Sequence, residues 1–235
     1  MLRVKDLNGG YGVVQVIWEI DLEVKQGEIT ALIGSNGVGK TTLMRTIAGN
    51  IPPMGGQILY KGEEITNQPQ PLRVRNGISM IPEGRQLYFG MTVEDNLIMG
   101  AYTRQDKAAV RKDMEWVYGI FPILHERSRQ LAGTLSGGES QMAAIARGLM
   151  SNPQLLLVDE LSLGLAPVVV EMLLQILTKI HKEKGLTILL VDQDVQAALD
   201  ISKYGYVIDN GKVVMQMESA LLKNNPDIKK AYLGL

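Results

Sequence analysis

The sequence contains no cysteine among its 235 residues. Without thiols the chain cannot form a disulfide or a cysteine-ligated zinc site, which fits a reducing compartment. Its longest apolar runs, such as residues 155–158, have the length of a strand and fall far short of the roughly 20 residues that a membrane-spanning helix needs. Residues 1–6 show no apolar signal-peptide core. We therefore expect a cytoplasmic protein, and any chain that crosses a membrane beside it would be a separate one.

The sequence also has no excess of positive or negative charge. The chain carries 24 Lys and Arg against 25 Asp and Glu, a formal net charge of -1. Such a balance gives no basic field to attract nucleic acid, so we expect no nucleic-acid partner. The hydrophobic share of 46% is ordinary for a soluble globular protein, and the length is enough for one large α/β domain with a buried core.

Apolar residues follow different periods in different parts of the chain. The first and last thirds alternate strand and helix signals, whereas residues 92–150 have mostly helical spacing. Continuous or alternating apolar runs predict strands at 2–7, 20–24, 29–33, 155–158 and 187–191. Helices are predicted from 42 and over 168–184, a hairpin-like stretch from Gly55 and Gly56, and a hairpin with an Asn-Gly turn at 210–211.

The segment from Gly34 to Thr41 fits the phosphate-loop pattern G-x-x-x-x-G-K-[ST] between a predicted strand and a predicted helix. Its glycines let backbone N–H groups wrap around phosphates, and the helix N-terminus favours their negative charge. Lys40 is expected to reach the β- and γ-phosphates, and Thr41 to ligate Mg²⁺. The predicted ATP-binding residues are Gly34, Asn36, Gly37, Val38, Gly39, Lys40, Thr41 and Thr42.

A second motif follows further along the chain: the apolar run 155–158 is followed directly by Asp159 and Glu160. At the carboxyl end of a parallel strand, Asp159 is placed to bind Mg²⁺, and Glu160 is placed to orient and deprotonate the attacking water. An apolar strand followed by two acids is a weak signal by itself, because acidic residues often end strands. Together with the upstream loop it predicts a nucleotide hydrolase in which Lys40 and Glu160 are catalytic.

Ser136, Gly137 and Gly138 precede another predicted helix, whose N-terminus and serine hydroxyl suit an anion. Residues 135–139, Leu-Ser-Gly-Gly-Glu, resemble the signature of ABC ATPases. The resemblance implies an α/β fold of the P-loop NTPase (RecA-like) kind, with a parallel sheet, an N-terminal antiparallel β-subdomain and an inserted α-helical signature subdomain.

The same resemblance implies how the chain is divided and assembled. Residues 1–235 would form a single nucleotide-binding domain, with 1–90 and 152–235 as the catalytic core and about 91–151 as the helical part. Ser136, Gly137 and Gly138 would contact ATP on an opposing cassette, in a head-to-tail dimer with a sister ATPase subunit or with a second copy.

Further positions narrow the resemblance. Tyr11 stands where the family stacks a ring on adenine, although a turn tyrosine is the alternative. Glu83, in Pro-Glu-Gly-Arg, stands where most ABC ATPases have glutamine, and is expected near Mg²⁺. Gln193 stands where most have the switch histidine, and is expected to contact the γ-phosphate or the attacking water unless it only packs nearby. With residues 162–167 and the ending 231–234, these resemble the LivF-type ATPases of branched-chain amino acid importers.

That subfamily implies a peripheral protein on the inner face of the cell membrane, bound to cytoplasmic loops of permease subunits. Its ATP hydrolysis would energise uptake of branched-chain amino acids; urea or short amides are the alternative cargo. Residues 86–91, with Tyr88 and Phe89, would form an apolar docking surface if they are exposed, or part of the domain's own core if they are buried.

Three positions depart even from the subfamily pattern: Ser140 replaces a glutamine, Gly148 an alanine and Leu161 a proline. Leu161 follows Glu160 directly, so it bears on how that carboxylate is aimed. Leu161, Ser140 and Gln193 leave open a module that binds nucleotide without hydrolysing it. A soluble ABC ATPase acting on nucleic acid or ribosomes is disfavoured by the single domain and the neutral charge balance.

Overall fold

The computed structural model describes residues 1–233, which contain two sheets. The larger sheet has the strand order β10-β9-β3-β8-β7-β6, with all neighbours parallel except the pair β9 and β10. Its strands are β3 (Ile29–Ile33), β6 (Ile78–Ile81), β7 (Leu155–Asp159), β8 (Thr187–Val191), β9 (Tyr204–Asp209) and β10 (Lys212–Glu218). The parallel strands all present their carboxyl ends at one edge, which is where ligands bind in open α/β sheets.

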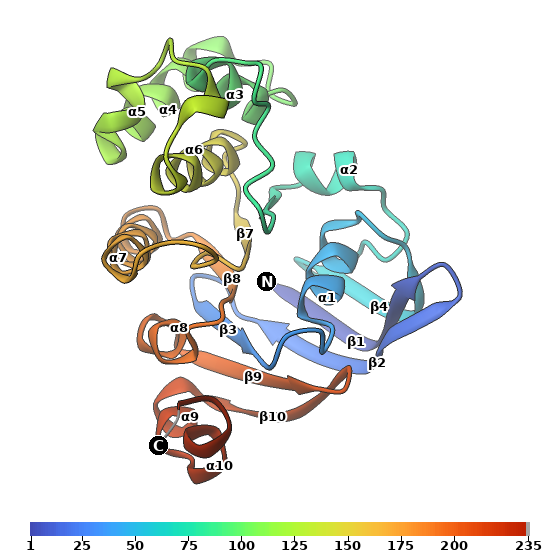
Figure 1. The fold of residues 1–235 in the computed structure, drawn as a ribbon. Coiled ribbons are helices and arrows are strands. Elements are labelled where there is room, and N and C mark those ends of the chain that lie inside the picture. The colour runs from blue at the N-terminus through green and yellow to red at the C-terminus, as the bar shows by residue number, and fades with distance from the viewer. Residues whose placement is uncertain (234–235) are drawn as a thin grey trace.

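The smaller sheet is antiparallel and comes mostly from the N-terminal part of the chain. Its order is β2-β1-β4-β5, formed by β1 (Leu2–Tyr11), β2 (Val14–Val24), β4 (Pro53–Tyr60) and β5 (Glu63–Glu64). Helix α1 (Lys40–Ala48) lies between this sheet and the larger one, as Figure 1 shows. Helix α1 therefore packs against both sheets, and these contacts fix the position of its N-terminus relative to each sheet.

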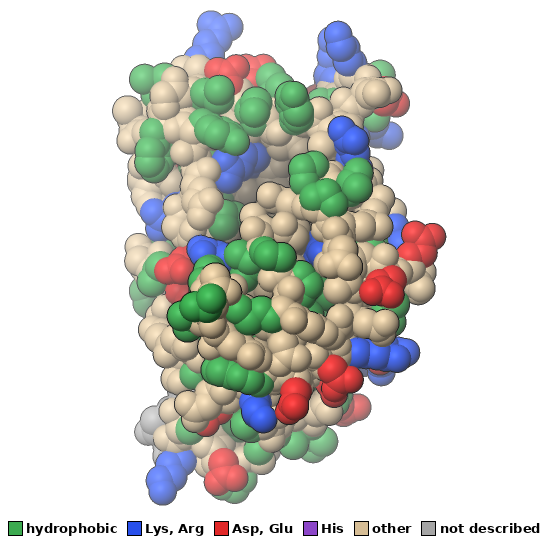
Figure 2. Space-filling view, turned by 90° about the vertical axis from the view of Figure 1, so that its right-hand side faces the viewer, with side chains coloured by type: hydrophobic (Ala, Val, Ile, Leu, Met, Phe, Trp, Pro, Cys, Tyr) green, Lys and Arg blue, Asp and Glu red, His purple; other side chains and the backbone are tan. Residues whose placement is uncertain are grey.

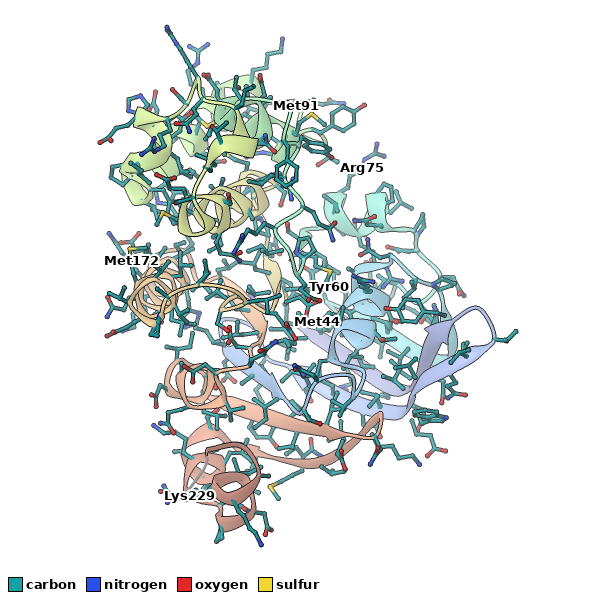
Figure 3. The ribbon with its side chains drawn as sticks, in the orientation of Figure 1. Met44, Tyr60, Arg75, Met91, Met172 and Lys229 are labelled. Atoms are coloured by element: carbon teal, nitrogen blue, oxygen red, sulfur yellow. The ribbon has the colours of Figure 1, made fainter. Side chains whose placement is uncertain are left out.

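The central strands of the larger sheet are buried on both faces. Successive residues of β7 alternate between two cores: Leu155 and Leu157 join the core around α1, whereas Leu156 and Val158 join the core on the opposite face. This burial on both faces explains why the strand reads as a continuous apolar run. In Figure 3, Met44 of α1 and Tyr60 of β4 lie close together in the first of these cores.

The second core is covered by helices. These are the long α7 (Pro167–Lys184) and the shorter α8 (Val195–Ile201), with α6 (Gly137–Met150) above them in Figure 1. A helical group at the top of that view contains α3 (Val93–Gly100), α4 (Lys107–Ile120), α5 (Pro122–Glu126), the short η1 (Ala132–Thr134) and α6. The remaining helical segments are α2 (Gln70–Arg75), α9 (Ser219–Asn224), α10 (Pro226–Ile228) and the π-helical turn η2 (Lys229–Leu233).

The predicted fold class is confirmed, with one local correction at the start of α1. Gly55 and Gly56 lie inside β4, beside an irregularity in its pairing with β1, and the predicted hairpin-like stretch is the antiparallel pair of β4 and β5. A Cβ at Gly56 would lie 2.3 Å from the carbonyl oxygen of Asp6, so the strand needs glycine where the two backbones approach. Helix α1 begins at Lys40, two residues before the predicted start at 42. Gly234, the last residue of the predicted ending, lies outside the described residues.

A search of residues 1–233 for a helix with the length and hydrophobicity of a bilayer-crossing segment finds none.

Candidate active site

The phosphate loop connects β3 to α1 and leaves the N-terminus of that helix uncovered. Gly39 occupies the N-cap position with φ 106°, and no side chain caps the helix there. The first backbone N–H groups of α1 therefore lack the usual capping partner and are available to an anion, which the helix dipole also favours. Thr41 and Thr42 lie in this first turn.

Two glycines of the loop are required by close contacts. A Cβ at Gly34 would lie 2.3 Å from the carbonyl oxygen of Ile208 in β9, and one at Gly39 would lie 2.6 Å from Cγ2 of Ile17. Either contact is far below van der Waals distance, so a side chain at either position would push the loop away from the sheet. The loop thus owes its position to neighbours in both sheets.

The turn between β9 and β10 also holds the phosphate loop, which the sequence did not predict. The N–H of Gly211 donates to the carbonyl of Val38 at 3.1 Å, and the N–H of Trp18 donates to the carbonyl of Gly211 at 2.9 Å. The Asn-Gly turn was expected only as a hairpin connection, because nothing in its sequence indicates a contact with residues far upstream. Asn36 and Gly37 remain exposed at the tip of the loop.

Lys40 is buried and points back into its own loop. Its Nζ donates to the carbonyl oxygens of Gly34 and Ser35, both at 2.8 Å. Burial lowers the pKa of the ammonium, while the nearby Glu160 and Asp159 carboxylates raise it. A cation held by two neutral carbonyls beside the uncovered helix N-terminus can be transferred to phosphate oxygens at little structural cost.

Asp159 ends β7 directly opposite this lysine-bearing loop. The hydroxyl of Thr41 donates to its Oδ1 at 3.2 Å, while Oδ2 is buried without a hydrogen-bond partner in the described part of the chain. The pKa of Asp159 is raised from 3.8 to about 6, mainly by burial and less by the charges of Glu160 and Glu83, while the hydrogen bond from Thr41 opposes the shift. An unpartnered buried carboxylate oxygen beside a threonine hydroxyl is the donor set that Mg²⁺ accepts.

Residues 1–233 contain no group of three or more His, Asp or Glu side chains arranged to hold a metal. The protein oxygens present, those of Thr41 and Asp159, fit a magnesium ion that takes its remaining ligands from phosphate and water, as Mg²⁺ usually does.

Glu160 and Gln193 meet at the ends of neighbouring strands. The side-chain amide of Gln193 donates to Oε2 of Glu160 at 2.8 Å, and the N–H of Glu160 donates to the carbonyl of Val191 at 2.9 Å. Glu160 has φ 51°, a left-handed conformation that a non-glycine residue adopts only when its surroundings impose it. The amide therefore orients the carboxylate that was predicted to be the base.

A buried carboxylate that the sequence analysis did not single out joins the same two loops. Asp192 accepts hydrogen bonds from the N–H of Ser162 at 3.1 Å, from its hydroxyl at 2.5 Å, and from the N–H of Asp194 at 2.9 Å. Burial raises the pKa of Asp192, and the hydrogen bonds from Ser162 and Asp194 oppose that shift. Asp192 thus ties the loop after β7 to the loop after β8, on which Gln193 lies.

Two other predicted residues lie around the site. Glu83 follows β6, and its charge acts on Asp159, as the pKa of Asp159 indicates. Tyr11 ends β1 and is 44% exposed as a residue, and Nη1 of Arg45 donates to its hydroxyl at 3.4 Å. Tyr11 is therefore accessible to a flat ligand. Glu83 contributes a negative charge near Asp159, at the carboxyl ends of the strands of the larger sheet.

The signature residues form a separate region. Ser136 caps α6: its hydroxyl accepts from the N–H of Glu139 at 3.3 Å, and Oε2 of Glu139 accepts from the N–H of Ser136 at 2.8 Å. Ser136 and Gly137 are exposed, and Gly138 is half-buried. No hydrogen bond of the described residues joins Ser136, Gly137 or Gly138 to the phosphate loop. The structure therefore does not bring the two anion-binding helix ends together within one chain.

The three unusual positions are accommodated in the core. Leu161 is fully buried in the core beneath α7, and Ser140 is buried within α6. A Cβ at Gly148 would lie 3.1 Å from Cγ1 of Ile81, so the glycine allows α6 to approach β6 closely. Ser79 of β6 uses that approach to donate to the Gly148 carbonyl at 3.2 Å.

The comparisons with known proteins agree with this geometry. The family model described as ABC transporter matches residues 17–162. The chain belongs to the ABC transporter family. This cassette is 44% identical to the high-affinity branched-chain amino acid transport ATP-binding protein BraG of Pseudomonas aeruginosa, over the full length of both chains. It is 36% identical to the probable branched-chain amino acid transport ATP-binding protein LivF of Archaeoglobus fulgidus, covering 100% of this chain and 99% of that protein.

Solved structures show the same fold. An ATP-binding subunit of an ABC transporter is 29% identical, with a TM-score of 0.84 over 100% of this cassette and 96% of that chain. An ATP-binding cassette of another ABC transporter, at 24% identity, has a TM-score of 0.88 over 99% and 98% of the two chains. The family match and these relatives show that the cassette is an ATP-binding ATPase.

Proposed function

We propose that this cassette is the ATP-hydrolysing subunit of an importer for branched-chain amino acids. The observation that carries the proposal is its 44% identity to BraG over the full length of both chains. Nothing in the cassette would touch the amino acid itself, so the cargo follows from the relatives and not from the site. The alternative cargo, urea or short amides, has no observation in its favour.

Hydrolysis is assigned to residues at the carboxyl edge of the larger sheet. Lys40 exchanges the two loop carbonyls for β- and γ-phosphate oxygens, and the N–H groups of α1 hold the remaining phosphate charge. A magnesium ion held by Thr41 and Asp159 would neutralise charge that develops on the phosphates. Glu160 takes a proton from the attacking water, and Gln193 keeps its carboxylate in place.

A second cassette is proposed to complete the site. Ser136 and Gly137 are exposed at the N-terminus of α6 and form no hydrogen bond to the phosphate loop of their own chain among the described residues. In a head-to-tail dimer, with a sister ATPase subunit or a second copy, these residues would contact the γ-phosphate of the partner's ATP. Closing and opening of this dimer would couple hydrolysis to movement.

The membrane subunits are proposed to dock beside the helical region, about residues 91–151. Tyr88, Phe89 and Met91 precede α3 and are 49%, 64% and 38% exposed, and Leu131 beside them is 49% exposed. Figure 2 shows hydrophobic side chains in the upper half of one face, and Figure 3 labels Met91 at the edge of the helical group. Exposed apolar residues of this kind suit a short helix from a permease, which would hold the cassette on the inner face of the membrane.

Uptake by cells that lack this cassette tests the proposal. We expect loss of labelled leucine, isoleucine and valine uptake, restored by the wild-type chain but not by Glu160→Gln. Normal uptake of all three amino acids, with loss of urea or amide uptake, would move the cassette to another importer.

A further inference from the structure

The first turn of α6 contains a carboxylate, that of Glu139. A negative side chain is unexpected at a helix N-terminus that is proposed to bind the γ-phosphate. Glu139 lies three residues after Ser136. Oε2 accepts from the Ser136 N–H at 2.8 Å, and the serine hydroxyl serves as acceptor for the Glu139 N–H at 3.3 Å. The box thus fixes the serine and uses its hydroxyl as an acceptor, so the hydroxyl proton remains available to an incoming oxygen.

The capping box of Ser136 and Glu139 fixes the serine, but its negative charge opposes the binding of an anion. A helix N-terminus attracts anions through its dipole and its free N–H groups, and a carboxylate in the first turn uses up part of that attraction. Two negative groups a few ångströms apart also repel each other. If the γ-phosphate of a second cassette approaches Ser136, the charge of Glu139 must be countered by a nearby cation.

Arg127 supplies that cation. Its Nε lies 2.6 Å from Oε1 of Glu139, on the side of the carboxylate that does not contact Ser136. Nη1 of Arg127 donates to the side chain of Gln130 at 3.0 Å, which directs the guanidinium from the end of α5 toward α6. The Ser136 N–H, and with it Arg127, lowers the pKa of Glu139, so the carboxyl stays charged and paired.

A second arginine lies nearby but is bound elsewhere. A guanidinium nitrogen of Arg85 lies 3.6 Å from the position of a Cβ at Gly137. Arg85 donates to the neutral side chain of Gln141 at 3.1 Å and to the carbonyl of Leu163 at 3.3 Å. Arg127 is therefore the cation paired with Glu139.

We propose that Arg127 is a positioning residue for the signature serine: by pairing with Glu139 it holds the capping box and neutralises the box's charge, so that α6 can accept the γ-phosphate of a second cassette. This inference rests on the proposed two-cassette function. It predicts that replacing Arg127 weakens the association of two cassettes only when residue 139 carries a negative charge.

Four full-length chains test this dependence, all carrying Glu160→Gln to retain ATP: the reference chain, Arg127→Met, Glu139→Gln, and the double variant. Sedimentation velocity with Mg-ATP measures association of each chain, alone and mixed with a sister ATPase subunit. We expect Arg127→Met to raise the chain concentration needed for half-association about five-fold while residue 139 is glutamate. With glutamine at 139, whose amide oxygen can still accept from the Ser136 N–H, the same change should raise it by less than about two-fold.

Two further variants separate charge from folding. Arg127→Lys keeps the cation and should associate like the reference, so it tests the proposal even if Arg127→Met is unstable. Arg129→Met removes an exposed arginine two residues away and should leave association unchanged. Thermal unfolding and binding of a fluorescent ATP analogue to the single chain show in each case that the fold and phosphate loop are intact.

Each other outcome counts against the proposal. Equal losses from Arg127→Met with glutamate or glutamine at 139 would reduce Arg127 to a packing role. No loss with glutamate at 139 would remove its role altogether. If the reference chain binds the ATP analogue yet never associates with Mg-ATP, the two-cassette function itself fails, and the inference fails with it.

Discussion

The two helix N-termini of this cassette that suit an anion differ in how complete their surroundings are. At α1, Lys40, Thr41 and Asp159 converge within one chain, and Lys40 and the buried Oδ2 of Asp159 are ready to exchange their present surroundings for ligand atoms. At α6, Ser136 is exposed and bonded only within its own capping box. The proposed nucleotide contacts of the first region lie within one chain, whereas those proposed for the second require another cassette.

The difference separates binding from turnover. Changes at the carboxyl edge of the larger sheet should alter what one chain does with its nucleotide. Changes at the N-terminus of α6 should alter only what happens when two cassettes meet. Four predictions test that separation.

Glu160→Gln should have the largest effect. Removing the base is expected to slow hydrolysis by roughly 10²–10⁴-fold, because the amide cannot accept the proton of the attacking water. Binding of Mg-ATP should persist, since Lys40 and Asp159 are untouched. Phosphate release and equilibrium binding of labelled ATP measure the two quantities, and turnover near the wild-type rate would remove Glu160 from the role of base.

Asp159→Asn should separate stability from function. The folded-state pKa of about 6 lies above the ordinary 3.8, so the buried charge costs stability above pH 6, and that cost fades as the pH falls from about 6 to 3.8. The variant without nucleotide should gain about 1–3 kcal/mol in free energy of unfolding near neutral pH and less in acid. It should lose Mg²⁺-dependent hydrolysis.

Urea unfolding at several pH values measures the predicted gain. The exposed Asp209→Asn is the matched control and should show no such gain. In the wild type, the Mg²⁺ concentration needed for activity should rise as the pH falls through 6, because the metal requires the ionised carboxylate. A destabilised Asp159→Asn chain at neutral pH would contradict the burial account.

Ser136→Ala should reduce hydrolysis by about ten-fold through loss of one phosphate donor, while ATP binding to the single chain stays unchanged. The change also removes a helix cap, which costs about 1 kcal/mol of stability. Thr92→Ala is the matched control, because Thr92 forms the same kind of capping box with Asp95 on α3. Equal rate losses in the two variants would mean that Ser136 acts only as a cap.

Gln193→Ala should have the smallest effect, a loss of about three- to ten-fold in turnover with little change in ATP affinity, because its exposed hydrogen bond to the Glu160 carboxylate contributes about 1 kcal/mol. Its physical reason is the 2.8 Å bond that holds Glu160. Gln196→Ala, which changes an exposed side chain in the first turn of α8, should turn over normally. An unchanged rate in Gln193→Ala would leave Gln193 as packing beside the site.

The two regions also differ in what the sequence could predict. The phosphate loop, Asp159 with Glu160, and Ser136 with its glycines each lie in a short segment whose spacing carries its own physical reason, so their expected elements could be named in advance. The Asn-Gly turn was equally visible, but its bond to Val38 was not, because the two residues are far apart in the chain.

The contacts that the sequence missed share this property. Asp192 with Ser162, and Gly148 with Ile81, join segments whose approach depends on the packed fold. The sequence predicted the hairpin-like stretch that begins at Gly55 and Gly56, but not that Gly56 lets β4 pass close to the backbone of Asp6. The short motifs could be predicted from the sequence. The contacts between distant segments that orient the motif side chains were seen only in the structure.

The dependence of hydrolysis on cassette concentration shows whether the phosphate loop needs a second signature helix. Phosphate release per chain should be measured from concentrations at which sedimentation shows single cassettes to those at which it shows pairs, with a sister ATPase subunit present and absent. We expect ATP binding at every concentration but turnover only where cassettes pair. Constant turnover per chain among single cassettes would show that the phosphate loop needs no second signature helix.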